Sequence, residues 1–268
     1  MDTPAIKRII LLHFRRLRKS YNDIKDAARM EPIHDFRVEY KKLRAFLRLL
    51  SFSENQHRLK VPGHLKRVYK CGGTVRDLQL HITNLEGGEK ELKMPSGHVH
   101  QLKKDLIIAK RNLKKTLSPE IIPETKKEII DQVSGSLTVS VVEQFISYKS
   151  AEINDILSGR LLRDLDFHQV RKNLKDIIYN AKIITKQPGF HLPWKVWNTE
   201  KENSFNELAD DLGNFQDIVN QSAFLKRIRE KASESEKKLI AMSMTKLKDK
   251  KKQLKISLLR KFSGKEYF

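Results

Sequence analysis

The sequence has one cysteine, few aromatic residues and no long hydrophobic run, and each shortage excludes a class of protein. Cys71 is the single cysteine among 268 residues. It allows neither a disulfide within this chain nor a cysteine-based zinc site, which fits the cytoplasmic location that we expect. No stretch approaches the ~18 consecutive apolar residues of a membrane helix, so no membrane span is expected. The apolar patch Ile9–Leu12 is followed at once by basic residues and lacks the cleavage site of a secretory signal.

Sequence motifs of catalytic phosphate and metal chemistry are also missing. The chain has no glycine-rich phosphate loop, and its nine histidines form no H-E-x-x-H motif that would bind zinc from a helix. His98 and His100 lie two residues apart, a spacing that places them on different sides of a helix. We therefore expect neither a metal site nor a cofactor.

Positive charge dominates what is present. Lysine and arginine number 54 against 33 acidic residues, which gives a formal net charge of +21. Such an excess repels itself in the compact state and concentrates anions around the protein. Nucleic acid, an anionic membrane surface and a phosphate polymer are the natural partner classes. The hydrophobic fraction of 39% is still ample for a core in a chain of this length.

Two His-x-x-Arg motifs begin matching rows of basic residues, one in each half of the chain. The first begins at His34 and the second at His168, 134 residues later. In both rows an arginine or lysine follows the histidine at offsets 3, 7 and 14, and these positions fall on one narrow stripe of an α-helix. Like charges in a row on one helix repel each other unless an anion compensates for them. Two such rows therefore indicate a duplicated scaffold that holds a polyanion.

A second repeated pattern has nearly the same period. Gly73 and Asp77 lie four residues apart and precede an aliphatic residue, as do Gly213 and Asp217, 140 residues later. Two independent patterns at nearly one period favour an internal duplication. We interpret the two aspartates as residues that pair with basic side chains or cap neighbouring helices.

Apolar residues recur at helical spacing through most of the chain, which predicts an all-α fold. Helices are expected at residues 4–28, 32–50, 63–85, 98–117, 202–231 and 234–262. One more begins within 137–146, although this segment starts with strand-like alternation, and another holds His168 and ends before Pro188. Residues 123–133 form a helical connector, while Gly87-Gly88 and Pro95 break the chain. This order predicts two four-helix bundles related by internal duplication, residues 1–118 and 119–268.

The chemistry of the stripes suits binding. Arginine grips phosphate oxygens with a planar fork, lysine adds a point charge, and histidine becomes cationic when an anion raises its pKa. A row of this length extends ~21 Å along a helix, which matches a linear anion better than a small one. The predicted binding residues are the first stripe (His34, Arg37, Lys41, Arg44, Arg48), the second stripe (His168, Arg171, Lys172, Lys175, Lys182) and Arg15, Arg18 and Lys19 of the first helix.

The two stripes are not equal. Ile178 stands in the second where Arg44 stands in the first, so we expect the first half to bind more strongly. The remaining basic residues are interpreted as solvated surface, including Lys42 and the lysines at 248–255. Trp194 and Trp197 are expected to pack within their inter-helix loop.

The segment from His34 to Leu50 resembles the signature of the CHAD family, the conserved histidine α-helical domain. The segments around Asp77 and Asp217 look like other recurring elements of that family, and the resemblance covers almost the whole chain. It implies two four-helix bundles with pseudo-twofold symmetry around a basic central cavity that the stripe residues face. It also implies inorganic polyphosphate as the ligand, without catalysis. The leading hypothesis is a polyphosphate-binding module that acts in polyphosphate metabolism or at a polyphosphate granule.

Two alternatives remain open. A nucleic-acid-binding protein fits the charge, but the aromatic residues, 7% of the chain, are not interleaved with the stripes as base stacking would require. A phosphotransferase or phosphatase that uses His34 as its nucleophile lacks an evident acid partner or metal site.

Overall fold

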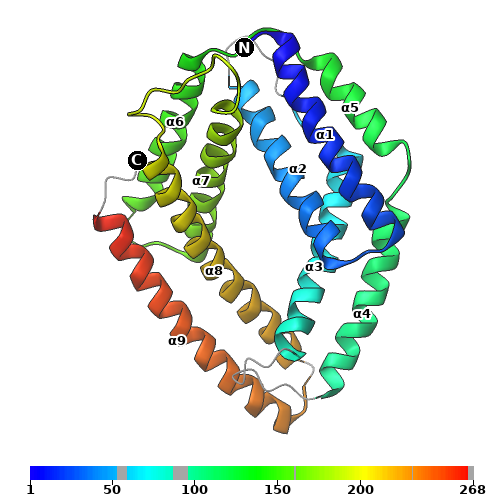
Figure 1. Cartoon of the computed structure of the whole chain (residues 1–268). Helices are drawn as coiled ribbons and strands as arrows, with labels where there is room; N and C mark the ends of the chain where they lie inside the picture. Colours follow the sequence, from blue (N-terminus) through cyan, green and yellow to red (C-terminus); the bar gives the residue numbers. More distant parts are fainter. Residues whose placement is uncertain (53–58, 87–95, 160, 231, 265–268) are drawn as a thin grey trace. The chain divides into compact units, whose positions relative to one another are not determined.

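The computed structural model describes residues 1–52, 59–86, 96–159, 161–230 and 232–264 (Figure 1). The helices within these ranges are α1 (Thr3–Asp26), α2 (Met30–Leu50), α3 (Gly63–Glu86), α4 (Ser96–Lys115), α5 (Ile121–Gln132), α6 (Val139–Leu157), α7 (Asp164–Ile184), α8 (Thr199–Arg229) and α9 (Glu234–Gly264). The described residues form no strand, which confirms the predicted all-α class. The predicted breaks at Gly87-Gly88 and Pro95 lie outside the described residues.

The predicted helices are all present, including the one expected to begin within 137–146 and the expected helical connector. Residues 139–146 continue into α6 because Val142, Phe145, Ile146 and Ile153 bury one helical face, which outweighs the strand-like alternation before them. The expected connector is α5, and it buries Ile121, Ile122, Thr125 and Ile129. Because this apolar face packs against α1, α5 is a full structural element.

The helix contacts divide the chain into two compact units. The first unit comprises residues 1–80, 104–145 and 179–192. Helices α1 and α2 pack together in it, and Leu17, Phe36, Leu43 and Phe46 are fully or almost fully buried. Asp2 caps α1 by accepting a 2.9 Å hydrogen bond from the backbone N–H of Ala5. The first stripe therefore lies on a helix whose opposite face is anchored in a core.

The second unit comprises residues 81–103, 146–178 and 193–268. Helices α8 and α9 pack against each other in it. The ring centroids of Phe167 and Phe215 lie 4.8 Å apart. Trp197 is only 6% exposed and meets Phe205 edge to face, as expected. The prediction for Trp194 is wrong, because this side chain is 68% exposed.

Each unit draws residues from both halves of the sequence, and α7 contributes to both units. The predicted division into residues 1–118 and 119–268, the duplication of whole bundles and the shared central cavity remain predictions. Among the described helices, none combines the length and the apolar character needed to cross a membrane.

Candidate anion-binding site

The first stripe lies along α2 in the first unit. Ile33, Phe36 and Leu43 are buried on the core face of this helix, as the apolar spacing predicted. The stripe occupies positions between and beyond them, so His34 and Arg48 are exposed. Lys41 and Arg44 are half-buried.

Arg37, the arginine of the first His-x-x-Arg motif, extends its side chain from α2 to α3. Its Nη1 donates a 2.7 Å hydrogen bond to the carbonyl oxygen of Tyr69, and its Cζ lies 4.4 Å from the centre of the Tyr69 ring. A Cβ atom built on Gly73 would lie 2.5 Å from the same Nη1, so a larger residue at this position would push the guanidinium of Arg37 aside. The two repeated patterns of the sequence thus touch each other, a relationship that their spacing did not indicate.

Tyr40 and Arg44 extend this set of contacts along α2. The buried Tyr40 ring stacks on Tyr69 with centroids 4.2 Å apart and planes 18° from parallel. The Cζ of Arg44 lies 6.0 Å from the centre of the Tyr40 ring. Its Nε is buried and has no hydrogen-bond partner within the described ranges. A buried donor without a partner costs free energy, so this end of the Arg44 guanidinium is not stabilised by a hydrogen bond to the described residues around it.

His34 has an electrostatic environment that favours its neutral form. Partial burial lowers the pKa of the His34 imidazole, and the nearby charges of Arg76, Lys41 and Arg37 lower it further, while Asp35 opposes them. The neutral ring can donate one hydrogen bond to an anion. An anion bound beside it would offset the cationic neighbours and raise the pKa of His34.

Glu39 is a buried carboxylate between α1 and α2. Its Oε1 lies 2.6 Å from Nδ1 of His13 and 3.7 Å from Nη1 of Arg16, and its Oε2 lies 3.4 Å from Nζ of Lys42. Burial raises the pKa of Glu39, but the hydrogen bond with His13 and the three positive partners outweigh burial and lower it overall. Lys42 was expected to be solvated, and this was wrong because it forms an ion pair with Glu39.

The Glu39–His13 pair was missed at the level of sequence. The available signal was a titratable residue on the apolar face of each helix: His13 precedes Phe14 within the buried face of α1, and Glu39 falls between Phe36 and Leu43 on α2. Facing polar residues on two packed apolar faces predict a buried pair, although only the structure shows that these two helices meet.

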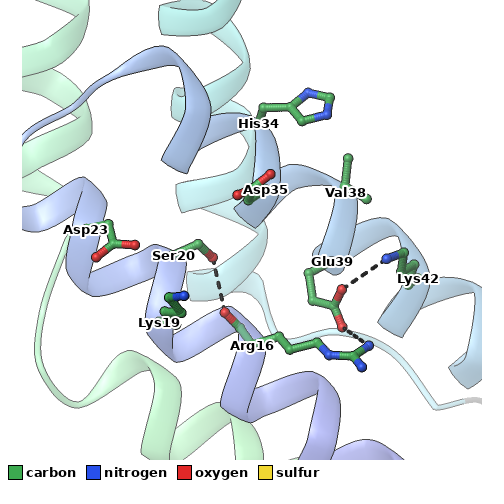
Figure 2. A pocket seen from close by; sticks show the side chains of 9 residues that line it. All are labelled: Arg16, Lys19, Ser20, Asp23, His34, Asp35, Val38, Glu39 and Lys42. Carbon is green, nitrogen blue, oxygen red and sulfur yellow. Dashed lines mark hydrogen bonds and ion pairs between the residues drawn. The ribbon is translucent and has the colours of Figure 1, made fainter.

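A shallow depression of about 320 Å³ lies at this cluster (Figure 2). It is lined by His34, Ser20 and Val38, by three cations, Arg16, Lys19 and Lys42, and by three carboxylates, Asp23, Asp35 and Glu39. These formal charges cancel, and Arg16 and Lys42 both reach toward Glu39 (Figure 2). The depression is therefore a poor place to concentrate anions. The row of cations along α2 beyond His34 is the stronger candidate.

The predicted cations of α1 lie on its surface. Arg15, Arg18 and Lys19 are all exposed, and Lys19 borders the depression together with His34. Because α1 packs against α2, these three cations belong to the same unit as the first stripe. Their role as a second basic wall remains a prediction.

The second unit repeats the arginine contact. Nε of Arg171 on α7 donates a 3.3 Å hydrogen bond to the carbonyl oxygen of Ala209 on α8. A Cβ atom on Gly213 would lie 3.2 Å from Nη2 of this arginine. The second His-x-x-Arg motif thus meets the second glycine in the manner of the first.

The remainder of the second stripe is less basic than the first. Nζ of Lys175 lies 3.8 Å from a carboxylate oxygen of Asp210, while Asp176 and Ile178 are buried. Lys172 is exposed, and His168 and Lys182 are half-buried. Lys182 belongs to the part of α7 that lies in the first unit.

The lysines at 248–255 divide into two groups on α9. Lys251 forms an ion pair with Asp164 of α7, and Lys255 donates a 2.6 Å hydrogen bond to the carbonyl oxygen of Leu162. The expectation of a solvated surface was wrong for these two, because Lys251 contacts the first residue of α7 and Lys255 contacts the segment just before this helix. Lys248, Lys250 and Lys252 are exposed as expected.

Comparisons with known proteins agree with this helical architecture. The family model described as the CHAD domain matches residues 8–226. The crystal structure of the CHAD domain from the plant Ricinus communis is similar with a TM-score of 0.71 and 12% sequence identity, over 100% of this chain and 95% of that chain. At this identity the likeness concerns the fold alone. No curated protein sequence matches the chain.

Proposed function

This chain belongs to the CHAD domain family, and from that premise we propose that it binds inorganic polyphosphate without transforming it. In the first unit the ligand contacts are made by His34, Lys41, Arg44 and Arg48 of α2, with Arg15, Arg18 and Lys19 of α1. In the second unit His168, Lys172 and Lys175 make a smaller contribution, because Asp176 and Ile178 dilute its charge. A cytoplasmic location, including association with polyphosphate granules, belongs to the same proposal.

The observation that carries the proposal is the row of accessible cations along one face of α2. From His34 to Arg48 this row rises ~21 Å, so it presents charge to an extended anion at several points. Charge-assisted hydrogen bonds contribute about 1.5–3 kcal/mol each. Arg44 is half-buried within this row, so its contribution depends on the part of the guanidinium that is not covered.

The two alternatives receive less support from the site. For a nucleic-acid binder, Tyr40 and Tyr69 are the aromatic residues beside the stripe, but they stack on each other and Tyr40 is buried. For a phosphotransferase, the His34 ring would need a group that orients it. Within the described ranges no side chain forms a hydrogen bond with this ring.

Isothermal titration with polyphosphate of uniform chain length and with single-stranded DNA of equal charge, at one salt concentration, tests the proposal. The decisive variant is the double substitution Arg44→Ala and Arg48→Ala. Its matched control is Lys250→Ala and Lys252→Ala, which removes two exposed cations from α9. We expect polyphosphate to bind more tightly than DNA. The α2 variant should lose affinity on the order of 100-fold, since each lost contact contributes about 1.5 kcal/mol, and the control less than about twofold, because exposed charges are screened.

Three results would contradict the proposal. Equal losses in the two variants would indicate diffuse attraction to the whole basic surface. Equal affinity for DNA would favour the nucleic-acid alternative. Release of phosphate or of shortened chains from polyphosphate, lost on His34→Ala, would favour the enzyme.

A further inference from the structure

We infer that Arg37 is a positioning residue. It anchors α2 to α3 and, through the stacked rings of Tyr69 and Tyr40, holds the guanidinium of Arg44 in position. That Arg44 then contacts phosphate rests on the proposed function above, whereas the contact of Arg37 with α3 does not. Arg37 would otherwise be taken as one more ligand-binding cation of the stripe.

The first step is the contact with α3. In an α-helix the N–H of Gly73 bonds to the carbonyl oxygen of Tyr69, four residues earlier. A carbonyl oxygen can accept a second hydrogen bond, and Arg37 supplies it at 2.7 Å. A side chain on Gly73 would displace the guanidinium from this oxygen, because its Cβ would lie 2.5 Å from Nη1 of Arg37. Glycine thus opens the path by which the arginine reaches the backbone, and we name this the arginine–glycine contact.

The second step leads from Arg37 to Arg44. The Cζ of Arg37 lies 4.4 Å from the Tyr69 ring centre, Tyr69 stacks on Tyr40 at 4.2 Å, and Tyr40 lies 6.0 Å from the Cζ of Arg44. Cation–π contacts of this length are attractive. A displaced Arg37 would therefore free the Tyr69 ring, and through the stacked pair it would loosen Arg44.

In the second unit the arginine–glycine contact occurs without the tyrosines that lead to Arg44. Arg171, Gly213 and the Ala209 carbonyl form the same arginine–glycine contact, again with the carbonyl four residues before the glycine. At the offset of 134 residues, Leu174 and Ile178 take the positions of Tyr40 and Arg44. At the offset of 140 residues, Ala209 takes the position of Tyr69. The contact is thus kept while both tyrosines and the second arginine are replaced together. This joint replacement indicates that the arginine–glycine contact is structural and that the tyrosines serve Arg44.

The first experiment displaces Arg37 without removing its charge. Gly73→Ala places a methyl group against Nη1, whereas Gly72→Ala, the matched control, places one at an ordinary 3.5 Å from Cγ2 of Ile33. Both substitutions gain equally in helix propensity. We expect Gly73→Ala to lower the midpoint of thermal unfolding relative to Gly72→Ala by about 2–4 °C, because the displaced guanidinium loses its hydrogen bond to Tyr69, and to weaken polyphosphate binding about fivefold, although every cation remains. Gly213→Ala should lower the midpoint less, because its Cβ would lie at 3.2 Å.

The second experiment asks whether Arg37 acts through Arg44. Polyphosphate affinity is measured for Arg37→Ala, Arg44→Ala and the double variant, at a temperature well below their unfolding midpoints. We expect Arg37→Ala to weaken binding about tenfold in the wild-type background and less than about twofold when Arg44 is already alanine, since the two residues act as one unit. Arg37→Lys should not restore affinity, because an ammonium group lacks the planar fork. The near-ultraviolet circular dichroism of the stacked tyrosines should decrease in Arg37→Ala.

Different results overturn different parts of the inference. Equal unfolding midpoints for Gly73→Ala and Gly72→Ala would exclude the arginine–glycine contact. An equal loss from Arg37→Ala in both backgrounds would mean that Arg37 contacts the ligand independently of Arg44. If the wild-type protein fails to bind polyphosphate, the proposed function fails, while the unfolding midpoints and the tyrosine spectrum still decide the role of Arg37.

Discussion

Nδ1 of His13 lies 2.6 Å from Oε1 of Glu39, with both side chains buried where α1 packs against α2. A buried carboxylate is tolerated when close partners compensate for its lost hydration, and here Arg16 and Lys42 add to the histidine. The pair therefore joins the two helices that carry the proposed ligand contacts of the first unit.

Removal of Glu39 should destabilise the protein. Glu39→Ala leaves His13 buried without its partner, and loss of one member of a buried pair costs about 3–5 kcal/mol. Glu31→Ala on the exposed side of α2 is the control and should change the free energy of unfolding by less than about 0.5 kcal/mol. Urea unfolding at pH 7 measures both, and equal values would show that the pair contributes nothing.

The contribution of Glu39 should depend on pH. Its pKa in the folded protein is lowered, so its carboxylate stabilises the fold above the unfolded pKa of about 4.3, and this stabilisation is lost as the pH falls through the folded value. The difference in unfolding free energy between the wild type and Glu39→Gln should therefore shrink as the pH decreases from 5 to 3. A difference that stays constant over this range would contradict the assignment.

Polyphosphate binding should strengthen as the pH falls below neutrality. The pKa of His34 is lowered in the free protein, and a bound polyanion should raise it, so ligand binding takes up a proton. Proton NMR of the imidazole with and without polyphosphate measures this shift directly. His34→Gln should reduce the gain in affinity between pH 7 and pH 5, whereas a fully retained gain would assign the proton to another group.

Salt should weaken binding in proportion to the number of phosphate contacts. Six contacts would give a slope of roughly −4 for log affinity against log salt, with the coefficient of single-stranded nucleic acid. Lys41→Ala should reduce the magnitude of this slope by about 0.7, and Lys250→Ala should leave it unchanged. An equal reduction in the two variants would indicate that no defined contact involves Lys41.

Neighbouring lysines of α9 should differ in their effect on stability. Lys251 forms an ion pair with Asp164, and its Nζ lies 5.8 Å from the centre of the Phe215 ring, whereas Lys252 is exposed. Lys251→Met should cost about 1 kcal/mol, since the pair is partly exposed, and Lys252→Met less than about 0.5 kcal/mol. Thermal unfolding at low and high salt measures both, and the cost at Lys251 should be smaller at high salt.

Much of the fold could be predicted from periodicity, because each helix of this chain buries one regular apolar face. The stripe on α2 was predicted for the same reason, since its offsets follow helical geometry. The contact between Arg37 and Gly73 could not be predicted, because both residues were interpreted within their own helices and spacing along a chain does not show which helices meet. The nearly equal periods of the two patterns, 134 and 140 residues, were the available hint that they belong together.

The errors have a common physical origin. Lys42 was assigned to solvent because it lies off the stripe, and Lys251 and Lys255 as part of a charged helix face, yet each reaches an oxygen on another residue. Long lysine side chains can lie along a surface to a distant partner, so their composition and spacing alone do not distinguish a solvated lysine from a bridging one. Trp194 shows the converse error, because a large apolar side chain was assumed to be buried and is exposed.

The first unit is assembled from three separate stretches of the chain, which the ribosome synthesises at different times. Its last segment, residues 179–192, includes Asn180, whose side-chain amide donates a 3.1 Å hydrogen bond to the carbonyl oxygen of Ala45. Helices α1 and α2 therefore emerge well over 100 residues before the segment that completes their packing. At about 5–20 residues per second, the nascent basic helices wait for several seconds with part of their apolar surface uncovered.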